Sequence, residues 1–197
     1  MKQLSILIPT LPVRIDSYAS LIKNISNQIK KNNLEDKVQI LTFLDTKELS
    51  VGEKRNILLR SSIGKYVCFI DDDDLISEDY LQEIFNAISH DADCITFLGE
   101  YVEQGFKKDF VISTMNRDNY NEPNCFYRLP NHLCPVKREI ALSCLFSNKN
   151  YGEDSDYASK INKYIKNEYH IRKKLYFYMY DDAKSQTSPT NANKKIY

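Results

Sequence analysis

The sequence predicts an α/β fold whose first half is a mostly parallel, Rossmann-like sheet with helices on both faces. Over residues 1–98, β-rich apolar runs alternate with segments of helical period in the order β-α-β-α-β-α-β. This alternation is typical of parallel sheets built from βαβ units. The third apolar run is followed directly by four aspartates, Asp71–Asp74. They are expected at the carboxyl edge of the sheet, where open α/β sheets bind ligands.

The first three elements follow from periodicity. Leu4–Ile8 is an apolar run closed by Pro9, which is the pattern of a buried strand. Apolar residues then recur at a nearly helical period and predict a helix over 15–31. The segment 38–44 is β-rich and predicts a second strand, which ends at Asp45.

The next four elements complete the alternating half. Ser50 and Glu53 form a capping-box pattern that opens a helix running to Ser62. An apolar run at 66–70 predicts the third strand, and a helix capped at Ser77 follows, with apolar residues at its 81, 84, 85 and 88 positions. The run 94–98 predicts the fourth strand.

After residue 98 the alternation stops, and a short antiparallel and helical region is expected. Residues 101–113 resemble a hairpin, and 116–136 are loop-like with three prolines. Helices are expected over 137–146 and from about 153 to 168, and a Tyr-rich strand at 175–180. We expect residues 1–180 to form one domain of two halves, 1–98 and 99–180, followed by a polar tail at 181–197.

Composition limits the class of protein. The formal net charge is zero, which argues against a general nucleic-acid coat. Residues 1–98 hold 11 Lys and Arg against 15 Asp and Glu, whereas residues 99–197 hold 16 against 12. No apolar run approaches the length of a membrane span. The five cysteines include no C-x-x-C pair, so we expect reduced thiols in a cytoplasmic protein.

The aspartate run carries the strongest chemical signal. Adjacent carboxylates repel one another unless a cation lies among them. All-oxygen ligands suit a hard divalent ion such as Mg2+ or Mn2+, which commonly completes its shell with substrate phosphates. An EF-hand loop is excluded because its glycine and its spacing are missing. A solvated acidic turn is the plainer alternative.

Other candidate residues follow the predicted strands. The segment from Ile8 to Arg14 lacks both the G-x-G-x-x-G and P-loop patterns, which argues against NAD and against a P-loop kinase. Pro9 and Thr10 lie where a base could pack, and Asp45 could accept hydrogen bonds from a base or ribose. Lys54 and Arg55 open a helix whose N-terminal N–H groups predict an anion site.

Two later segments hold further candidates. His132 lies in a loop-like stretch, where a structural histidine is the plainer interpretation. Glu153 and Asp154 precede a predicted helix. They fit either an N-cap or a general base held at a well-ordered helix end.

Taken together, these segments resemble the family 2 glycosyltransferases of the GT-A fold. The resemblance rests on the strand that ends in Pro-Thr, the Gly-Glu-Lys-Arg-Asn helix opening, the run Gly-Lys-Tyr-Val-Cys-Phe-Ile-Asp-Asp-Asp-Asp-Leu and the later Gly-Glu-Asp. It covers about residues 1–98 closely and 131–180 more loosely. It implies a nucleotide-sugar-binding half at 1–98 and an acceptor-side half at 99–180.

The resemblance also implies residue roles. Asp71 to Asp73 would supply the D-x-D element, whose register is ambiguous by one, with Asp73 as the direct metal ligand and Asp71 as a second. Asp154 would be the base of an inverting mechanism. His132, Glu153 and His170 are candidates for acceptor or phosphate contacts. The implied donor-binding residues are Pro9, Thr10, Arg14, Asp45, Lys54, Arg55, Asp71 and Asp72.

The expected function is therefore metal-dependent transfer from a nucleotide-diphosphate sugar, with a UDP-sugar favoured and Mn2+ or Mg2+ as cofactor. The acceptor could be a glycan, a lipid-linked sugar or, as in some phage enzymes, a modified base of DNA. Two other classes stay open at this point: a nucleotide-binding module without turnover, and a metal-dependent phosphoryl-transfer enzyme.

Overall fold

The structure is a computed structural model that describes residues 1–116 and 118–181. Its centre is one ten-stranded sheet in the order β2-β1-β3-β9-β5-β6-β8-β7, with β10 paired to β5 and β4. The strands are β1 (Leu4–Thr10), β2 (Val38–Leu44), β3 (Tyr66–Phe69), β4 (Leu75–Ile76), β5 (Cys94–Glu103), β6 (Phe106–Ile112), β7 (Tyr120–Asn121), β8 (Cys125–Arg128), β9 (Val136–Lys137) and β10 (Glu168–Tyr180). The helices are the 3-10 turn Pro12–Arg14, α1 (Ile15–Lys31), α2 (Val51–Ser61), α3 (Tyr80–Ile88), α4 (Arg138–Ser143) and α5 (Glu153–Ile161).

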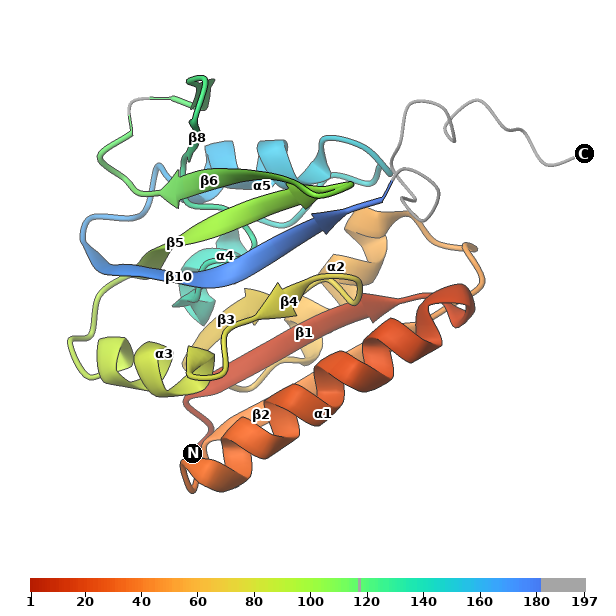
Figure 1. Cartoon of the computed structure of the whole chain (residues 1–197). Coiled ribbons are helices and arrows are strands. Elements are labelled where there is room, and N and C mark those ends of the chain that lie inside the picture. Colours follow the sequence, from red (N-terminus) through yellow and green to blue (C-terminus); the bar gives the residue numbers. More distant parts are fainter. Residues whose placement is uncertain (117, 182–197) are drawn as a thin grey trace, which may run out of the picture.

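The parallel core predicted for the first half is confirmed. β1 lies between β2 and β3 and is parallel to both, with Leu4 opposite Val38 on one side and Tyr66 on the other. β1 and β3 are almost wholly buried, as expected for parallel strands covered on both faces. α1 and α3 pack together on one side, while α2 contacts β1, β2, α4 and α5 (Figure 1).

The loop predicted over 116–136 is wrong in part, because the segment contains β7 and β8 and leads into β9. β9 lies between β3 and β5 and is antiparallel to both. The backbone of the preceding residues is fixed as well, since Phe69 N–H donates to His132 O and Ile95 N–H donates to Pro135 O. The position of β9 between β3 and β5 therefore places His132 beside the end of β3.

The end of α5 also differs from the sequence-based expectation. The helix ends at Ile161 rather than near residue 168. The Asp93 carboxylate accepts the backbone N–H groups of Lys166 and Asn167, which turns the chain into β10. β10 therefore begins at Glu168, seven residues before the expected strand at 175–180, and runs parallel to β5. α4 is likewise shorter than the expected 137–146.

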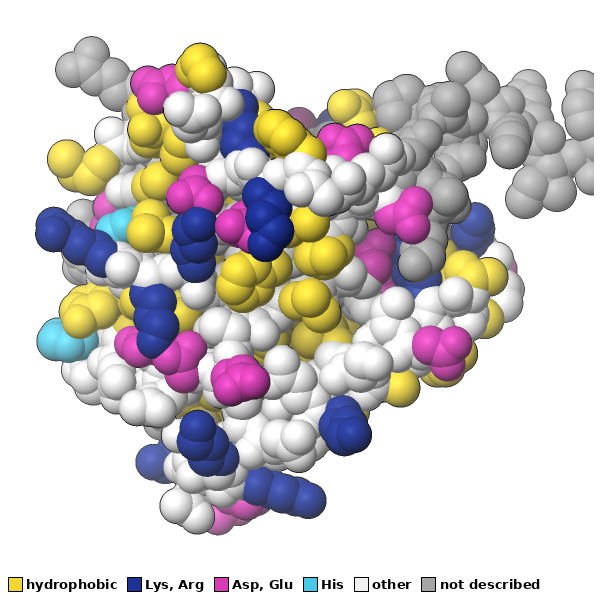
Figure 2. Space-filling view, in the orientation of Figure 1, with side chains coloured by type: hydrophobic (Ala, Val, Ile, Leu, Met, Phe, Trp, Pro, Cys, Tyr) yellow, Lys and Arg dark blue, Asp and Glu magenta, His cyan; other side chains and the backbone are white. Residues whose placement is uncertain are grey.

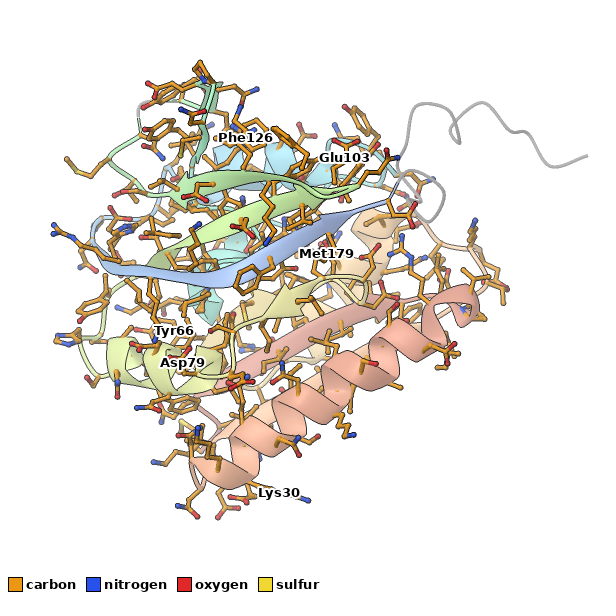
Figure 3. The ribbon with its side chains drawn as sticks, viewed as in Figure 1. Lys30, Tyr66, Asp79, Glu103, Phe126 and Met179 are labelled. Carbon is orange, nitrogen blue, oxygen red and sulfur yellow. The ribbon has the colours of Figure 1, made fainter. Side chains whose placement is uncertain are left out.

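The edge of the sheet at which β1, β3, β5 and β10 end holds the residues of interest. Figure 3 shows Glu103 and Met179, near the ends of β5 and β10, at this edge, and Tyr66 and Asp79 toward the opposite one. The expected hairpin at 101–113 is present, with its turn at Gln104 and Gly105, both at positive φ. None of the helices within residues 1–116 and 118–181 has the length and apolarity needed to cross a membrane. Most of the expected polar tail, 182–197, lies outside the described residues.

Candidate active site

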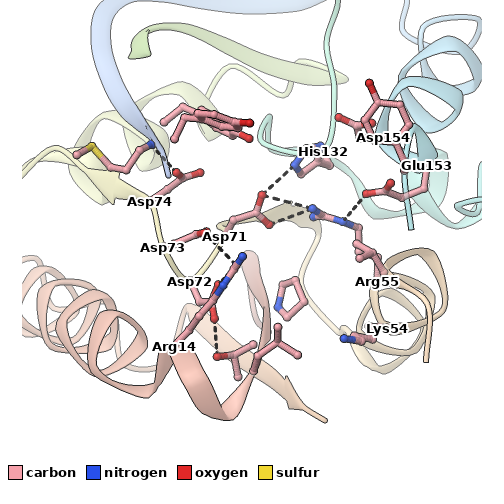
Figure 4. A pocket seen from close by; sticks show the side chains of 18 of the residues that line it. Arg14, Lys54, Arg55, Asp71, Asp72, Asp73, Asp74, His132, Glu153 and Asp154 are labelled. Atoms are coloured by element: carbon pink, nitrogen blue, oxygen red, sulfur yellow. Dashed lines mark hydrogen bonds and ion pairs between the residues drawn. The ribbon is translucent and has the colours of Figure 1, made fainter. Parts of the chain in front are cut away.

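A cavity of about 330 Å3 opens at the carboxyl edge of β1 and β3. Its walls come from the 3-10 turn after β1, the first turns of α2 and α5, the aspartate run and the end of β10 (Figure 4). We call it the first cavity. The lining residues are Pro9, Thr10, Leu11, Arg14, Val51, Lys54, Arg55, Asp71–Asp74, His132, Tyr151–Ser155 and Tyr178–Asp181.

The four aspartates fall into two kinds. Asp72 and Asp74 are 1% and 3% exposed and are fully engaged by the protein. Asp72 accepts hydrogen bonds from the Thr10 hydroxyl at 2.6 Å and from Arg14 at 2.8 Å. Asp74 accepts from the Tyr176 hydroxyl at 2.6 Å and from the Met179 N–H at 2.8 Å. These two aspartates therefore hold the loop in place.

Asp71 and Asp73 are the two that remain open to the cavity. Their side chains are 21% and 23% exposed. Burial, together with the charges of Asp71 and Asp72, raises the pKa of Asp73 to about 6, although Arg14 lies 3.0 Å away and opposes the shift. Asp71 and Asp73 are thus the two carboxylates of the run that a molecule in the cavity could reach. Asp72 borders the cavity as a support for Arg14 and Thr10.

Arg55 joins the aspartate run to the start of α5. Its buried guanidinium lies 3.0 Å from Asp71 and 3.6 Å from Glu153, and it packs over the rings of Phe69 and Phe146. Burial opposes ionisation of Asp71, but Arg55, His132 and Arg14 outweigh it and lower the pKa of that carboxyl. Burial raises the pKa of Glu153. Arg55 thus links the aspartate run to the first turn of α5 (Figure 4).

Several buried nitrogen atoms at this site lack hydrogen-bond partners among the described residues. They include Nη1 of Arg55 and both ring nitrogens of His132. His132 Nε2 lies 3.5 Å from Asp71, which is an ion-pair distance rather than a well-formed hydrogen bond. Because buried polar groups are nearly always satisfied, these atoms are candidates for contacts with a bound molecule.

The anion site predicted at the backbone of α2 is wrong. The N–H groups of Val51 and Gly52 donate to Asn150 and Lys149, and that of Glu53 donates to the Ser50 hydroxyl. Residues 147–150 can approach this closely because position 52 is glycine: a Cβ there would lie 1.9 Å from Ser147 O. The helix end is closed by protein, and only side chains of α2 face the cavity.

Lys54 and Asp45 form a buried ion pair of 2.5 Å. The other Asp45 oxygen accepts the Leu49 N–H. Lys54 lines the first cavity, whereas Asp45 does not. The expected contact between Asp45 and a nucleoside is therefore not formed by the cavity itself, and Asp45 instead fixes the position of Lys54.

Glu153 and Asp154 occupy the first turn of α5, after Gly152, whose φ of 74° is in the left-handed region. The N-cap is Gly152 and has no side-chain cap hydrogen bond, so the capping explanation for Asp154 is wrong. The Asp154 carboxylate accepts only the adjacent Ser155 N–H among the described contacts. Glu153, by contrast, is buried beside Arg55.

A second cavity of about 400 Å3 adjoins the first and shares His132, Asp154, Ser155 and Tyr178 with it. Its remaining lining comes from β5, β6, β7 and the residue before it, β8, the segment before β9, and α5. Those residues are Tyr101, Phe110, Ile112, Asn119, Asn121, Phe126, Arg128, Leu129, Asn131, Leu133 and Ala158. The two cavities therefore meet at Asp154.

The structure brings together most of the residues that the sequence indicated. One exception besides Asp45 is His170, which pairs with Thr96 near the start of β10, at the other end of the strand from Tyr178. It lines neither cavity. Sequence reasoning missed the end of β10, where Tyr176, Tyr178 and Met179 support or line the site. The alternating tyrosines of this strand are visible in the sequence. The sequence does not show that the strand pairs with β5, which is what brings its end to the site.

The site is thus an aspartate run at the carboxyl edge of an α/β sheet, with two cavities that both border Asp154. Residues 16–149 match the sequence profile of glycosyl transferase family 2. The chain belongs to that family. No curated protein matches it by sequence.

Solved structures show the fold. The crystal structure of S. aureus TarS 1-349 is 16% identical, with a TM-score of 0.65, and the match covers 90% of this chain and 60% of that one. TarS 1-349 in complex with UDP-GlcNAc is 14% identical at the same TM-score and covers 98% and 62%. The catalytic domain of Drosophila beta1,4galactosyltransferase 7, in complex with xylobiose, is 12% identical, with a TM-score of 0.64, and covers 100% and 77%. The GT-A fold is thereby confirmed, in a chain that spans about 60% of the TarS structure.

Proposed function

We propose that the chain transfers a sugar from a nucleotide-diphosphate sugar to an acceptor hydroxyl. The observation that carries this proposal is the position of Asp154, the carboxylate that borders both cavities. The first cavity takes the donor and the second takes the acceptor. A base between them is where a transfer reaction needs one.

The charge of the first cavity supports a bound divalent ion. Seven carboxylates and three Lys or Arg side chains line it. Burial, together with the neighbouring charges of Asp71 and Asp72, raises the pKa of Asp73 even though Arg14 opposes the shift, and a cation at this carboxylate would relieve both effects. No group of three His, Cys, Asp or Glu within the described part of the chain could hold a metal alone. Asp73, with Asp71, would therefore hold Mn2+ or Mg2+ together with the donor's phosphates, as is common for Mg2+.

When bound, the ion would stabilise the charge that develops on the departing diphosphate. The cationic side chains act on the same group. Arg55 presents Nη1, which has no hydrogen-bond partner among the described residues, and Lys54 lines the same cavity. We assign both to the donor's phosphates. Arg14 keeps Asp72 and Asp73 in place.

The nucleoside is assigned to the wall that Pro9, Thr10 and Leu11 form. The Thr10 hydroxyl is committed to Asp72, so this wall offers mainly a packing surface. UDP-GlcNAc and UDP are the ligands of two of the TarS structures. A UDP-sugar is therefore the first donor to test.

In the proposed reaction, Asp154 removes the proton of an acceptor hydroxyl held in the second cavity. The acceptor oxygen forms a bond to the anomeric carbon of the donor as the bond between that carbon and the diphosphate oxygen breaks. Attack from the side opposite the leaving group inverts the anomeric configuration. Glu153 is a positioning residue, because its carboxylate is buried beside Arg55.

A thermal-shift titration with Mn2+ and UDP, GDP, CDP or ADP tests the donor site. Ligand binding to the native state raises the melting temperature. We expect one nucleotide, with UDP first, to give a shift that needs Mn2+ and that Asp73→Asn removes. Asp36→Asn is the matched control, because Asp36 is exposed in the turn before β2 and lines neither cavity. This variant should keep the shift.

The contrary result is a shift with Mn2+ alone and none with any nucleotide. It would refute the sugar-nucleotide proposal and favour the phosphoryl-transfer class. A nucleotide shift without transfer to any acceptor or to water would favour the binding module.

A further inference from the structure

The second cavity is lined mainly by aromatic and apolar side chains. Tyr101 is one of its lining residues. Its ring lies edge-on to Phe126 at 5.6 Å and is stacked with Tyr178 at 5.7 Å between ring centroids. Phe110 and Ile112 add apolar surface from β6. Figure 3 shows Phe126 on β8, on the far side of the sheet from Lys30 of α1. The volume of about 400 Å3 lies within the range of roughly 300–1,000 Å3 for small-ligand sites.

The Phe110 wall depends on one glycine. Phe110 lies opposite Gly99 in the β5–β6 ladder. A Cβ at position 99 would meet the Phe110 ring at 2.0 Å. The absence of a side chain at position 99 therefore lets the Phe110 ring lie across β5. The pairing of β5 with β6 thus fixes this wall of the cavity.

The polar groups of the cavity are amides. The side-chain oxygens of Asn119 and Asn131 accept the backbone N–H groups of Leu129 and Leu133, which fixes both side chains. Their NH2 groups form no hydrogen bond within residues 1–116 and 118–181, and neither does the side chain of Asn121. Three neutral amide side chains thus line the cavity beside its aromatic walls.

Charge is scarce in the second cavity. Arg128 and Asp154 are its two ionised lining residues within the described chain, with His132 at the boundary. Arg128 donates through Nη1 to the backbone oxygens of Tyr120 and Tyr127 and is held against the Phe126 ring. Its guanidinium supports the loop. Lys108 also lies over Phe126, outside the cavity lining.

We propose that the acceptor is an uncharged saccharide bound in the second cavity, an inference that rests on the proposed glycosyl transfer. The C–H face of a pyranose ring would pack on Tyr101, Tyr178 and Phe126, because the partly positive C–H groups meet the negative ring face. The amides would bind its hydroxyls, and one hydroxyl would face Asp154. Phosphate or carboxylate groups on the acceptor would find few cations there.

The surface beside the cavity does not favour a nucleic-acid acceptor. Proteins that bind single strands combine aromatic platforms with a basic groove. Here three of the four lysines of β6 and β10 are paired with carboxylates: Lys107 with Glu100, Lys173 with Asp79, and Lys174 with Glu100 and Asp109. The fourth, Lys108, lies over the Phe126 ring. Figure 2 accordingly shows basic and acidic side chains interspersed over this face. Among the residues that the structure describes, the basic side chains on this face form no continuous stripe.

The test measures acceptor binding to protein loaded with Mn2+ and UDP. Saturation-transfer NMR and calorimetry would compare neutral methyl pyranosides and disaccharides, glucose 6-phosphate and a short single-stranded oligodeoxynucleotide. We expect a neutral saccharide to bind most tightly. Phe126→Leu should weaken it by about three- to tenfold through loss of the aromatic face. Asn121→Ala, at an exposed position, should weaken it without affecting folding.

Phe106→Leu is the matched control. Phe106 is an exposed aromatic residue on β6, the strand beside β8, and it lines neither cavity. The variant should bind as the unaltered protein does. Tighter binding of glucose 6-phosphate or of the oligonucleotide, equal affinities in both cavity variants and the control, or no binding by any neutral saccharide would overturn the inference. In each case an intact UDP shift shows that the donor site survives. Loss of that shift in the unaltered protein refutes the proposed function itself.

Discussion

The two cavities share a wall but are built in different ways. The first lies at the ends of the parallel strands β1 and β3, and ion pairs cross-link it: Arg14 to Asp72 and Asp73, Arg55 to Asp71 and Glu153, and Lys54 to Asp45. The second lies on β5, β6, β8 and β10 and is held by ring packing and by amides bonded to backbone. Ion pairs therefore hold the walls of the first cavity, whereas aromatic packing and neutral hydrogen bonds hold those of the second.

This contrast suits two different ligands. A diphosphate needs compensating charge that is fixed in place before binding. A neutral ring needs a surface of the right shape and a few directional donors. The contrast also predicts that changes in one cavity will leave binding to the other nearly intact, except at the residues they share.

The largest effect is expected at the shared wall. Asp154→Asn removes the proton acceptor while keeping the size of the side chain, so the rate of transfer should fall by about 10^2- to 10^4-fold. The UDP shift should stay, because the first cavity keeps its cations. Asp156→Asn, two residues along the same helix and outside both cavities, is the control. Retention of full activity by Asp154→Asn would assign the base to another residue.

The next largest effect is expected on the stability of the protein when the buried cation of the first cavity, Arg55, is removed. Arg55→Met leaves Asp71 and Glu153 buried without their cation, and breaking a buried pair in this way costs about 3–5 kcal/mol. The free energy of unfolding in urea would show it. Arg60→Met, at an exposed position of the same helix, should change little. Combining Arg55→Met with Glu153→Gln should recover part of the loss, and failure to do so would contradict the ion-pair account.

The first cavity could be predicted from sequence because its residues lie next to strand ends. Parallel strands place Thr10 and Asp71 at one edge once the βαβ pattern is recognised, and a local motif then positions each side chain. The alternation of engaged and open aspartates was beyond sequence reasoning, since it depends on Tyr176, which is 102 residues from its partner Asp74.

The second cavity could not be predicted, because it depends on contacts between strands that lie far apart in the sequence. It forms only when β10 pairs with β5, and when β8 joins β6 in parallel from a segment that looks like a loop. Short strands such as β7 and β9, of two residues each, carry almost no periodic signal. His170 was a candidate only through the resemblance. The expected helix ran to about residue 168, whereas Asp93 turns the chain into β10 at Glu168 and leaves His170 near the start of that strand, away from the site.

A smaller effect is expected for Gly99→Ala, which tests whether the second cavity depends on the Phe110 wall. The added methyl group would displace the Phe110 ring, and overpacking of this kind costs about 1–3 kcal/mol. Saccharide binding should weaken while the UDP shift persists at a lower melting temperature. Adding Phe110→Leu should restore stability without restoring the aromatic wall. Unchanged saccharide affinity in Gly99→Ala would remove Phe110 from the acceptor site.

The smallest effect is expected at Glu168, which ties the start of β10 to β5 and to the segment after β6. Its burial raises its pKa, but hydrogen bonds from Ser113, the Thr114 N–H and Thr96 outweigh burial and lower it. A carboxyl whose pKa is lower in the folded state stabilises the protein above the unfolded pKa, and that stability is lost as the pH falls through the folded value. Because Glu168 is partly exposed, solvent screening limits the contribution to at most about 1 kcal/mol. Urea unfolding of Glu168→Gln at neutral pH and again below the ordinary glutamate range would measure it. The variant should be less stable than the unaltered protein at neutral pH, and the difference should shrink in acid. A difference that is constant with pH would mean that the charge of Glu168 does not hold β10 in place.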